Sequence, residues 1–189
     1  MRRAALALLA LLCLGDRALA APPLPSELER SYDKFEDLTT ISSPQEAIRD
    51  TAGKPHFLQM KIMSEIDCHG DTICTRDSVS VSIIRQGADW FFLLVPEHDL
   101  YMISRGRRLT VPNKLFHFMP GGRAMEVLFF RFPTAAFADL FSGDIDCKIS
   151  GVRFALTPAR NPALAAMARW VAAADSIEAD TTSSERSGK

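Results

Sequence analysis

The sequence predicts a single α+β domain: a curved antiparallel sheet of about seven to nine strands, in one layer or folded into two, covered by two short helices. Strand-length apolar runs fill residues 78–111, separated by the short polar breaks QGAD, PEHD and RGRR. These residue types favour turns, and breaks this short join only antiparallel neighbours. We therefore expect a four-strand meander here. Two later segments, 134–142 and 161–174, carry the apolar spacing of helices.

The first twenty residues have the features of a secretory signal peptide. A basic start at residues 2–3 precedes an apolar run over 4–14, and Ala-Leu-Ala at 18–20 is the pattern that signal peptidase cleaves. The apolar run is too short for a transmembrane helix, which needs about twenty residues. We expect cleavage before Ala21 and export from a bacterial cell, to the periplasm or beyond.

The charge balance makes the mature chain mildly acidic. The full sequence has 22 Lys and Arg against 23 Asp and Glu, and removal of residues 1–20 leaves 19 against 22. This balance argues against nucleic acid as a partner, because phosphate binding needs a basic face. No later apolar run is long enough to span a bilayer.

The mature chain divides into three parts by composition. Residues 21–30 are rich in proline and form an extended lead-in, and residues 31–174 form the domain. Residues 175–189 are polar, with almost no large apolar side chain. Such a segment cannot bury enough apolar surface to fold, so a disordered tail is expected.

Three cysteines remain after cleavage. Cys68 and Cys74 lie at the two ends of the polar loop CHGDTIC, and an oxidising compartment favours a disulfide between them. Cys147 is then left over, either buried as a small apolar residue or paired with a partner chain. A bridge from Cys147 to one of the two loop cysteines is the competing connectivity.

The clearest strand is 77–84, in which serines alternate with Val79, Val81 and Ile83. It should form a hairpin with 56–66 through the cysteine loop. Residues 90–95 are apolar on both faces, which predicts a central strand. The other strands are expected at 32–42, 100–103, 109–111, 125–132, 145–150 and 152–158.

The remaining segments are a loop and two helices. Residues 112–123 read as a loop, with Phe116 and Phe118 packed beneath it. Thr134 is a suitable N-cap for the first helix, and Gly143 follows its end. Asn161 as N-cap and Pro162 at the first helical position begin the second helix.

The first candidate site is the loop 67–74, where a thiolate, an imidazole and carboxylates could bind zinc or another transition metal. A structural zinc site draws on two separated ligand pairs, and the sequence offers no second pair. A disulfide between Cys68 and Cys74 would also remove both thiolates. The disulfide is therefore favoured, and we expect neither a resident metal nor a cofactor.

Other candidate residues could form a ligand or partner surface. Glu97, His98 and Asp99 are types suited to acid–base chemistry, but adjacent turn residues splay apart. His117 lies between two phenylalanines. The run Arg105, Arg107 and Arg108 occupies a hairpin tip, where it could meet an anionic group or simply keep an edge strand soluble.

No nucleophile, phosphate-binding or metalloprotease motif occurs in the sequence. The leading hypothesis is an exported, non-catalytic binding or accessory module that acts on an envelope protein or ligand through its surface. The first alternative is an exported hydrolase whose polar residues, with Cys147 as one possible nucleophile, converge only in the fold. The second is a metal-handling protein that uses the 67–74 loop.

Overall fold

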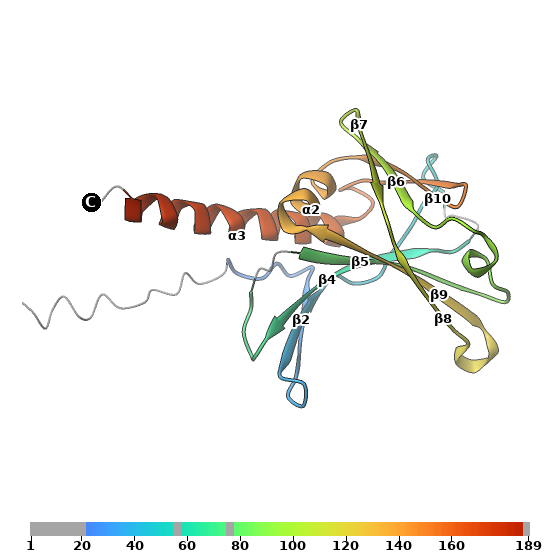
Figure 1. The fold of residues 1–189 in the computed structure, drawn as a ribbon, viewed down its shortest axis with the longest axis horizontal. Coiled ribbons are helices and arrows are strands. Elements are labelled where there is room, and N and C mark those ends of the chain that lie inside the picture. The colour runs from blue at the N-terminus through green and yellow to red at the C-terminus, as the bar shows by residue number, and fades with distance from the viewer. Residues whose placement is uncertain (1–21, 55–57, 75–77, 187–189) are drawn as a thin grey trace, which may run out of the picture.

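In the computed structural model, the described residues are 22–54, 58–74 and 78–186, with side chains described as far as Ala174. They form antiparallel sheets and two α-helices (Figure 1), which confirms the predicted α+β fold class. The predicted signal peptide lies outside the described residues.

The first sheet has seven strands in the order β1-β2-β4-β5-β9-β8, and the short β3 also pairs with β4. Its strands are β1 (Glu29–Asp33), β2 (Leu38–Ser42), β3 (Glu46–Ala47), β4 (Lys61–His69), β5 (Ser78–Gly87), β8 (Lys114–Phe118) and β9 (Ala124–Pro133). The second sheet has four strands in the order β11-β10-β6-β7. They are β6 (Leu100–Ser104), β7 (Arg107–Val111), β10 (Ile145–Ile149) and β11 (Val152–Leu156).

The hairpin predicted across the cysteine loop is present. β4 pairs with β5, so that Ile62 lies opposite Ile83, and both side chains are buried. β4 begins at Lys61 rather than at residue 56, and residues 55–57 lie outside the described part of the chain.

The meander predicted over 78–111 is wrong. β5 and β6 belong to different sheets, and residues 90–95 contain the 3-10 turn η1 (Phe92–Leu94) instead of a central strand. The buried carboxylate of Glu126 accepts hydrogen bonds from the backbone N–H groups of Phe91 and Leu93. Because these groups are bound to a side chain, they are not available for strand pairing.

The loop predicted over 112–123 is only partly correct. Residues 114–118 form β8, an edge strand paired with β9, and the 3-10 turn η2 (Pro120–Gly122) follows it. Phe116 and Phe118 are 51% and 49% exposed rather than packed beneath a loop. In a strand their side chains point to the face opposite Leu115, which packs against the core.

The first predicted strand, 32–42, is a hairpin of β1 and β2. Asp37 ends its turn with φ 50°, a left-handed conformation that Asp tolerates better than most residues. The lead-in before β1 contacts the fold, since Leu28 is buried and the Trp170 Nε1–H donates to the Pro22 carbonyl at 3.0 Å.

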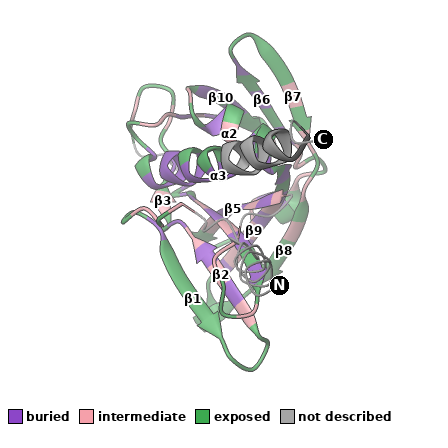
Figure 2. Cartoon of the chain, turned by 90° about the vertical axis from the view of Figure 1, so that its left-hand side faces the viewer, coloured by how far each residue is buried: buried purple, intermediate pink, exposed green. Residues whose placement is uncertain are grey.

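The two helices, α2 (Thr134–Phe141) and α3 (Pro162–Arg186), pack against each other at one end of the sheets (Figures 1 and 2), where α2 contacts β5 and β9 and α3 contacts β4. Residues 163–168 of α3 are all buried, and four of the six are alanine. A helix that is apolar on every side is buried on every side, and the small side chains of this segment let α2 approach it closely. One hydrophobic core therefore includes side chains from both sheets and both helices.

The beginning of α3 is at Pro162, as the sequence predicts, but its end is not. Residues 175–186, which the sequence predicts as a disordered tail, continue the helix to Arg186 and extend away from the sheets in Figure 1. Once the buried first half is formed, each added residue gains a hydrogen bond without a new nucleation cost.

A carboxylate from another element caps α3. Glu46 of β3 accepts hydrogen bonds from the backbone N–H groups of Ala163 at 2.8 Å and Leu164 at 3.1 Å. These are two of the N–H groups that have no partner within the helix. A residue remote in sequence thus supplements the local start signal at 161–162.

This cap gives a pH-dependent prediction. Burial raises the pKa of Glu46 above its ordinary value of 4.5, and the two backbone N–H groups oppose that rise. The folded chain therefore binds the carboxyl proton of Glu46 more tightly than the unfolded chain does, and proton binding stabilises the fold. This stabilisation is fully present below the ordinary pKa and is lost as the pH rises through the pKa of the folded state. The wild type should lose stability relative to Glu46→Gln between about pH 4 and about pH 7, measured by urea unfolding. A gain in relative stability over that range would contradict the assignment.

The predicted disulfide between Cys68 and Cys74 is present, with 5.8 Å between the two Cα atoms. Cys147 is free and buried on the inner face of β10. Of the alternatives for this residue, burial as a small apolar side chain is therefore the correct one.

Candidate functional site

The second sheet has one buried face and one exposed face. Alternate residues of β6, β10 and β11 are buried against the core, and those between them are accessible. The two-residue turn of Ser150 and Gly151, both with positive φ, sets the register of β10 and β11. The outer face carries Tyr101, Ile103, Arg108, Thr110, Asp146, Lys148, Arg153 and Ala155.

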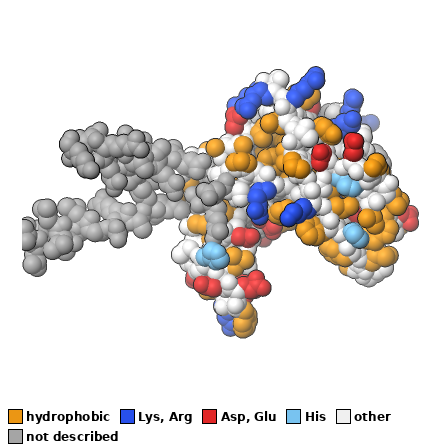
Figure 3. Space-filling view, viewed as in Figure 1, with side chains coloured by type: hydrophobic (Ala, Val, Ile, Leu, Met, Phe, Trp, Pro, Cys, Tyr) orange, Lys and Arg blue, Asp and Glu red, His pale blue; other side chains and the backbone are white. Residues whose placement is uncertain are grey.

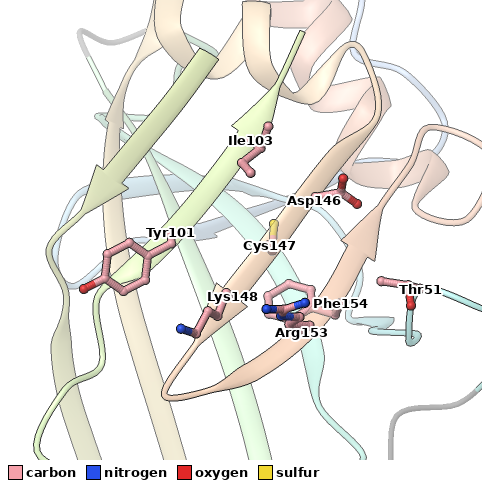
Figure 4. A pocket seen from close by; sticks show the side chains of 8 residues that line it. All are labelled: Thr51, Tyr101, Ile103, Asp146, Cys147, Lys148, Arg153 and Phe154. Atoms are coloured by element: carbon pink, nitrogen blue, oxygen red, sulfur yellow. The ribbon is translucent and has the colours of Figure 1, made fainter. Parts of the chain in front are cut away.

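A furrow runs along this outer face, parallel to β6 and β10. It consists of three adjoining cavities of about 240, 400 and 400 Å³. Tyr101 and Lys148 line both the first and the second cavity, while Thr51, Ile103 and Asp146 line both the second and the third. Figure 4 shows the middle cavity, with Tyr101, Lys148 and Arg153 side by side across three elements of its wall.

Two cations face each other in the middle of the furrow. Lys148 and Arg153 are directly opposite in the β10–β11 register. Like charges in this position destabilise a sheet, and neither side chain forms an ion pair with a carboxylate among the described residues. The Lys148 Nζ lies 5.9 Å from the centre of the Tyr101 ring. The middle of the furrow thus carries two cations and one carboxylate, that of Asp146, beside an aromatic floor.

The three arginines that were predicted to form one binding surface do not all point in the same direction. Arg105 and Arg107 contact Asp139 of α2 at 2.7 and 3.4 Å, which ties the β6–β7 hairpin to that helix. Arg108 points to the outer face, opposite Ile103. In Figure 3 cationic side chains gather at the top of the molecule, over this hairpin.

His98 is placed near a hydroxyl, but the hydrogen bonds do not make a nucleophile. Its Nδ1 lies 3.4 Å from Ser150 Oγ, and Ser150 Oγ–H donates to the carbonyl of Glu97. A hydroxyl has one proton, and here that proton is bound to a carbonyl rather than to the imidazole. The contact instead holds the 97–99 turn against the β10–β11 turn.

His117 lies elsewhere, on the edge strand β8, where its ring makes an edge contact with Trp90 at 5.6 Å. The two candidate histidines therefore belong to different sites: His98 borders the second sheet, while His117 is part of the first. They do not form one surface with the arginines.

Neither Cys147 nor the 67–74 loop supplies a reactive thiolate. Burial, with a smaller effect of Asp146, raises the pKa of the Cys147 thiol far above its ordinary value, so the thiol stays protonated. The disulfide occupies both loop cysteines. Over residues 22–54, 58–74 and 78–174, no three His, Cys, Asp or Glu side chains are grouped so that they could hold a metal ion.

The cationic pair was missed at the level of sequence, although the signal for it is present. A two-residue turn at 150–151 places residue 148 opposite residue 153 by counting outward from the turn. The alternation of the two strands then puts both side chains on the polar face. The arginine run at 105–108, by contrast, is visible in the sequence itself because its residues are close neighbours in the chain.

No family model, curated protein or solved structure matches the chain. Within the part of the chain that the structure describes, no helix is both long enough and apolar enough to cross a bilayer.

Proposed function

We propose that the chain is an exported, non-catalytic binding module, and that the furrow on its second sheet receives an extended, acidic segment of a partner. The observation that carries this proposal is the opposed pair of Lys148 and Arg153. Because the pair destabilises the free sheet, a negative group bound between the two cations would relieve the repulsion and gain two charge-assisted hydrogen bonds.

The dimensions of the furrow support an extended occupant. Its three cavities follow β6 and β10 from the turn at 96–97 to the turn at 105–106. Five residues of strand span about 16 Å, so a peptide of similar length in extended form would fit along them. Tyr101 and Ile103, 39% and 45% exposed, would lie beneath it and contact an apolar side chain.

Two features support export. The signal peptide pattern at 1–20 predicts it, and the disulfide between Cys68 and Cys74 is typical of oxidising compartments. Both agree with a periplasmic or secreted partner. The alternative of an exported hydrolase has less support, because the thiol of Cys147 is protonated and the Ser150 hydroxyl is bound to a carbonyl.

The test measures binding of a fluorescent peptide of alternating acidic and apolar residues. Replacing both Lys148 and Arg153 by Ala should weaken binding at least tenfold, since each charge-assisted hydrogen bond contributes about 1.5–3 kcal/mol. Lys148→Ala alone should leave the free energy of unfolding unchanged or raise it by about 0.5 kcal/mol, because it removes a like-charge pair.

The matched control is the pair Lys34→Ala and Arg123→Ala, which removes the same charge from two exposed positions that do not line the furrow. It should reduce affinity only slightly. If the control variant weakens peptide binding as much as the double variant of Lys148 and Arg153 does, the peptide is attracted by the net charge of the protein alone and the furrow is not the binding site. Failure of the wild type to distinguish the acidic peptide from a basic one of equal length would also refute the proposal.

A further inference from the structure

The outer face of the first sheet carries an apolar patch that the proposed binding function does not use. In the registers of β5, β8 and β9, Ile84 lies opposite Val127, which lies opposite Phe116. These directly opposed residues form a row across the strands. Phe118 and Met125, also opposite each other, lie in the neighbouring row on one side, and Phe129 lies in the neighbouring row on the other side. We call these six residues the apolar face.

The apolar face is separate from the core. The core residues of β5 and β9, among them Ile83, Leu128 and Phe130, point to the other side of the sheet and are fully buried. On the apolar face, Ile84, Met125, Val127 and Phe129 are half-buried, and Phe116 and Phe118 are about half exposed. Met119, 56% exposed, follows β8 in the turn. Contiguous apolar surface of this kind marks an interaction site.

Cations border the apolar face. Lys61 lies opposite Ile84, Lys114 opposite Phe129, and Arg131 opposite Ser80. None of the three forms an ion pair within the described residues. The two carboxylates in these rows, Glu65 of β4 and Glu29 of β1, both lie in the Arg131 row. The row of Phe116 therefore carries one cation, Lys61, and no carboxylate, while the row of Phe118 carries no charge.

We propose that the apolar face docks on a lipid bilayer with anionic headgroups. Phe116, Phe118 and Met119 would enter the boundary between headgroups and acyl chains, while Lys61, Lys114 and Arg131 would contact lipid phosphates. A second copy of the chain is disfavoured as the occupant, because two such faces in contact would bring their cations together without a matching set of carboxylates.

This docking leaves the furrow accessible. The inner faces of both sheets contribute side chains to one core, so the outer faces of both sheets point away from that core. A chain bound to a bilayer through its first sheet would present its second sheet to the aqueous compartment. The inference relies on the export part of the proposed function, since export brings the chain to a membrane surface, but not on the ligand of the furrow.

The test is co-sedimentation of protein, expressed from the full sequence and purified, with phosphatidylcholine vesicles that contain or lack phosphatidylglycerol. The wild type should bind the anionic vesicles and lose binding at high salt. Replacing both Phe116 and Phe118 by Ser should weaken binding about tenfold, because half of each ring loses its apolar contact. Lys114→Ala should weaken it about fivefold. Both variants should bind the acidic peptide as the wild type does.

Phe35→Ser is the matched control. Phe35 is 87% exposed and has a lysine over its ring, but it lies in the β1–β2 turn at the other edge of the sheet. It should leave vesicle binding unchanged. The proposal is overturned if Phe35→Ser weakens binding as much as the β8 variant, or if neutral vesicles bind equally well. It is also overturned if the wild type ignores vesicles and instead forms a dimer that the β8 variant abolishes in light scattering.

Discussion

Replacement of Glu126 by Ala is expected to destabilise the fold by about 3–5 kcal/mol, the cost of breaking a buried ion pair. Glu126 is fully buried in β9 and lies 2.7 Å from Arg85 of β5, whose side chain is only 11% exposed. The same carboxylate accepts from the backbone N–H groups of Phe91 and Leu93. Its loss leaves a buried cation and two N–H groups without their acceptor.

The measurement is urea unfolding followed by circular dichroism, with Glu36→Ala as the control. Glu36 lies exposed in the β1–β2 turn, so its removal should change stability by less than about 0.5 kcal/mol. Glu126→Gln combined with Arg85→Met keeps an acceptor for one N–H group and removes both charges, so it should be more stable than Glu126→Ala. If Glu126→Ala costs no more than the control, the carboxylate does not hold residues 90–95 in place.

Replacement of Phe137 by Ala is expected to cost about 3–5 kcal/mol, the range for a buried phenylalanine. Phe137 of α2 is fully buried. Its ring centre lies 4.6 Å from that of Phe141 and 6.4 Å from that of Phe132 in β9. The aromatic group joins the helical layer to the first sheet, so its truncation leaves a cavity between two layers.

Phe35→Ala removes the same atoms from a ring that is 87% exposed, and it should change stability by less than about 0.5 kcal/mol. Thermal unfolding of both variants, compared at equal concentration, separates the two effects. Equal stability of the two variants would mean that the helices do not form a packed layer with the sheet.

Elements defined by local chemistry could be predicted from the sequence. The alternation at 77–84, the cysteine loop, and the Asn-Pro start at 161–162 each produced the expected element. In these cases the residues that decide the structure are neighbours in the chain. The two-residue turn at 150–151 belongs to the same class, and with it the hairpin of β10 and β11.

Elements decided by distant residues could not be predicted. Residues 90–95 read as a strand, but the carboxylate of Glu126, more than thirty positions away, binds their N–H groups and leaves Leu94 74% exposed. Likewise, nothing in the run from 78 to 111 indicates that the chain leaves one sheet and enters another after β5. The site was missed for a related reason, because Lys148 and Arg153 matter only as a cross-strand pair.

The most direct test of the binding proposal is amide NMR of the isotope-labelled protein during titration with the acidic peptide. The proposal predicts shift changes that saturate together and centre on Tyr101, Ile103, Asp146, Lys148 and Arg153, which line the middle cavity of the furrow. Saturable changes confined to β8 and β9 or to the 67–74 loop, or the absence of any change at high peptide concentration, would contradict it.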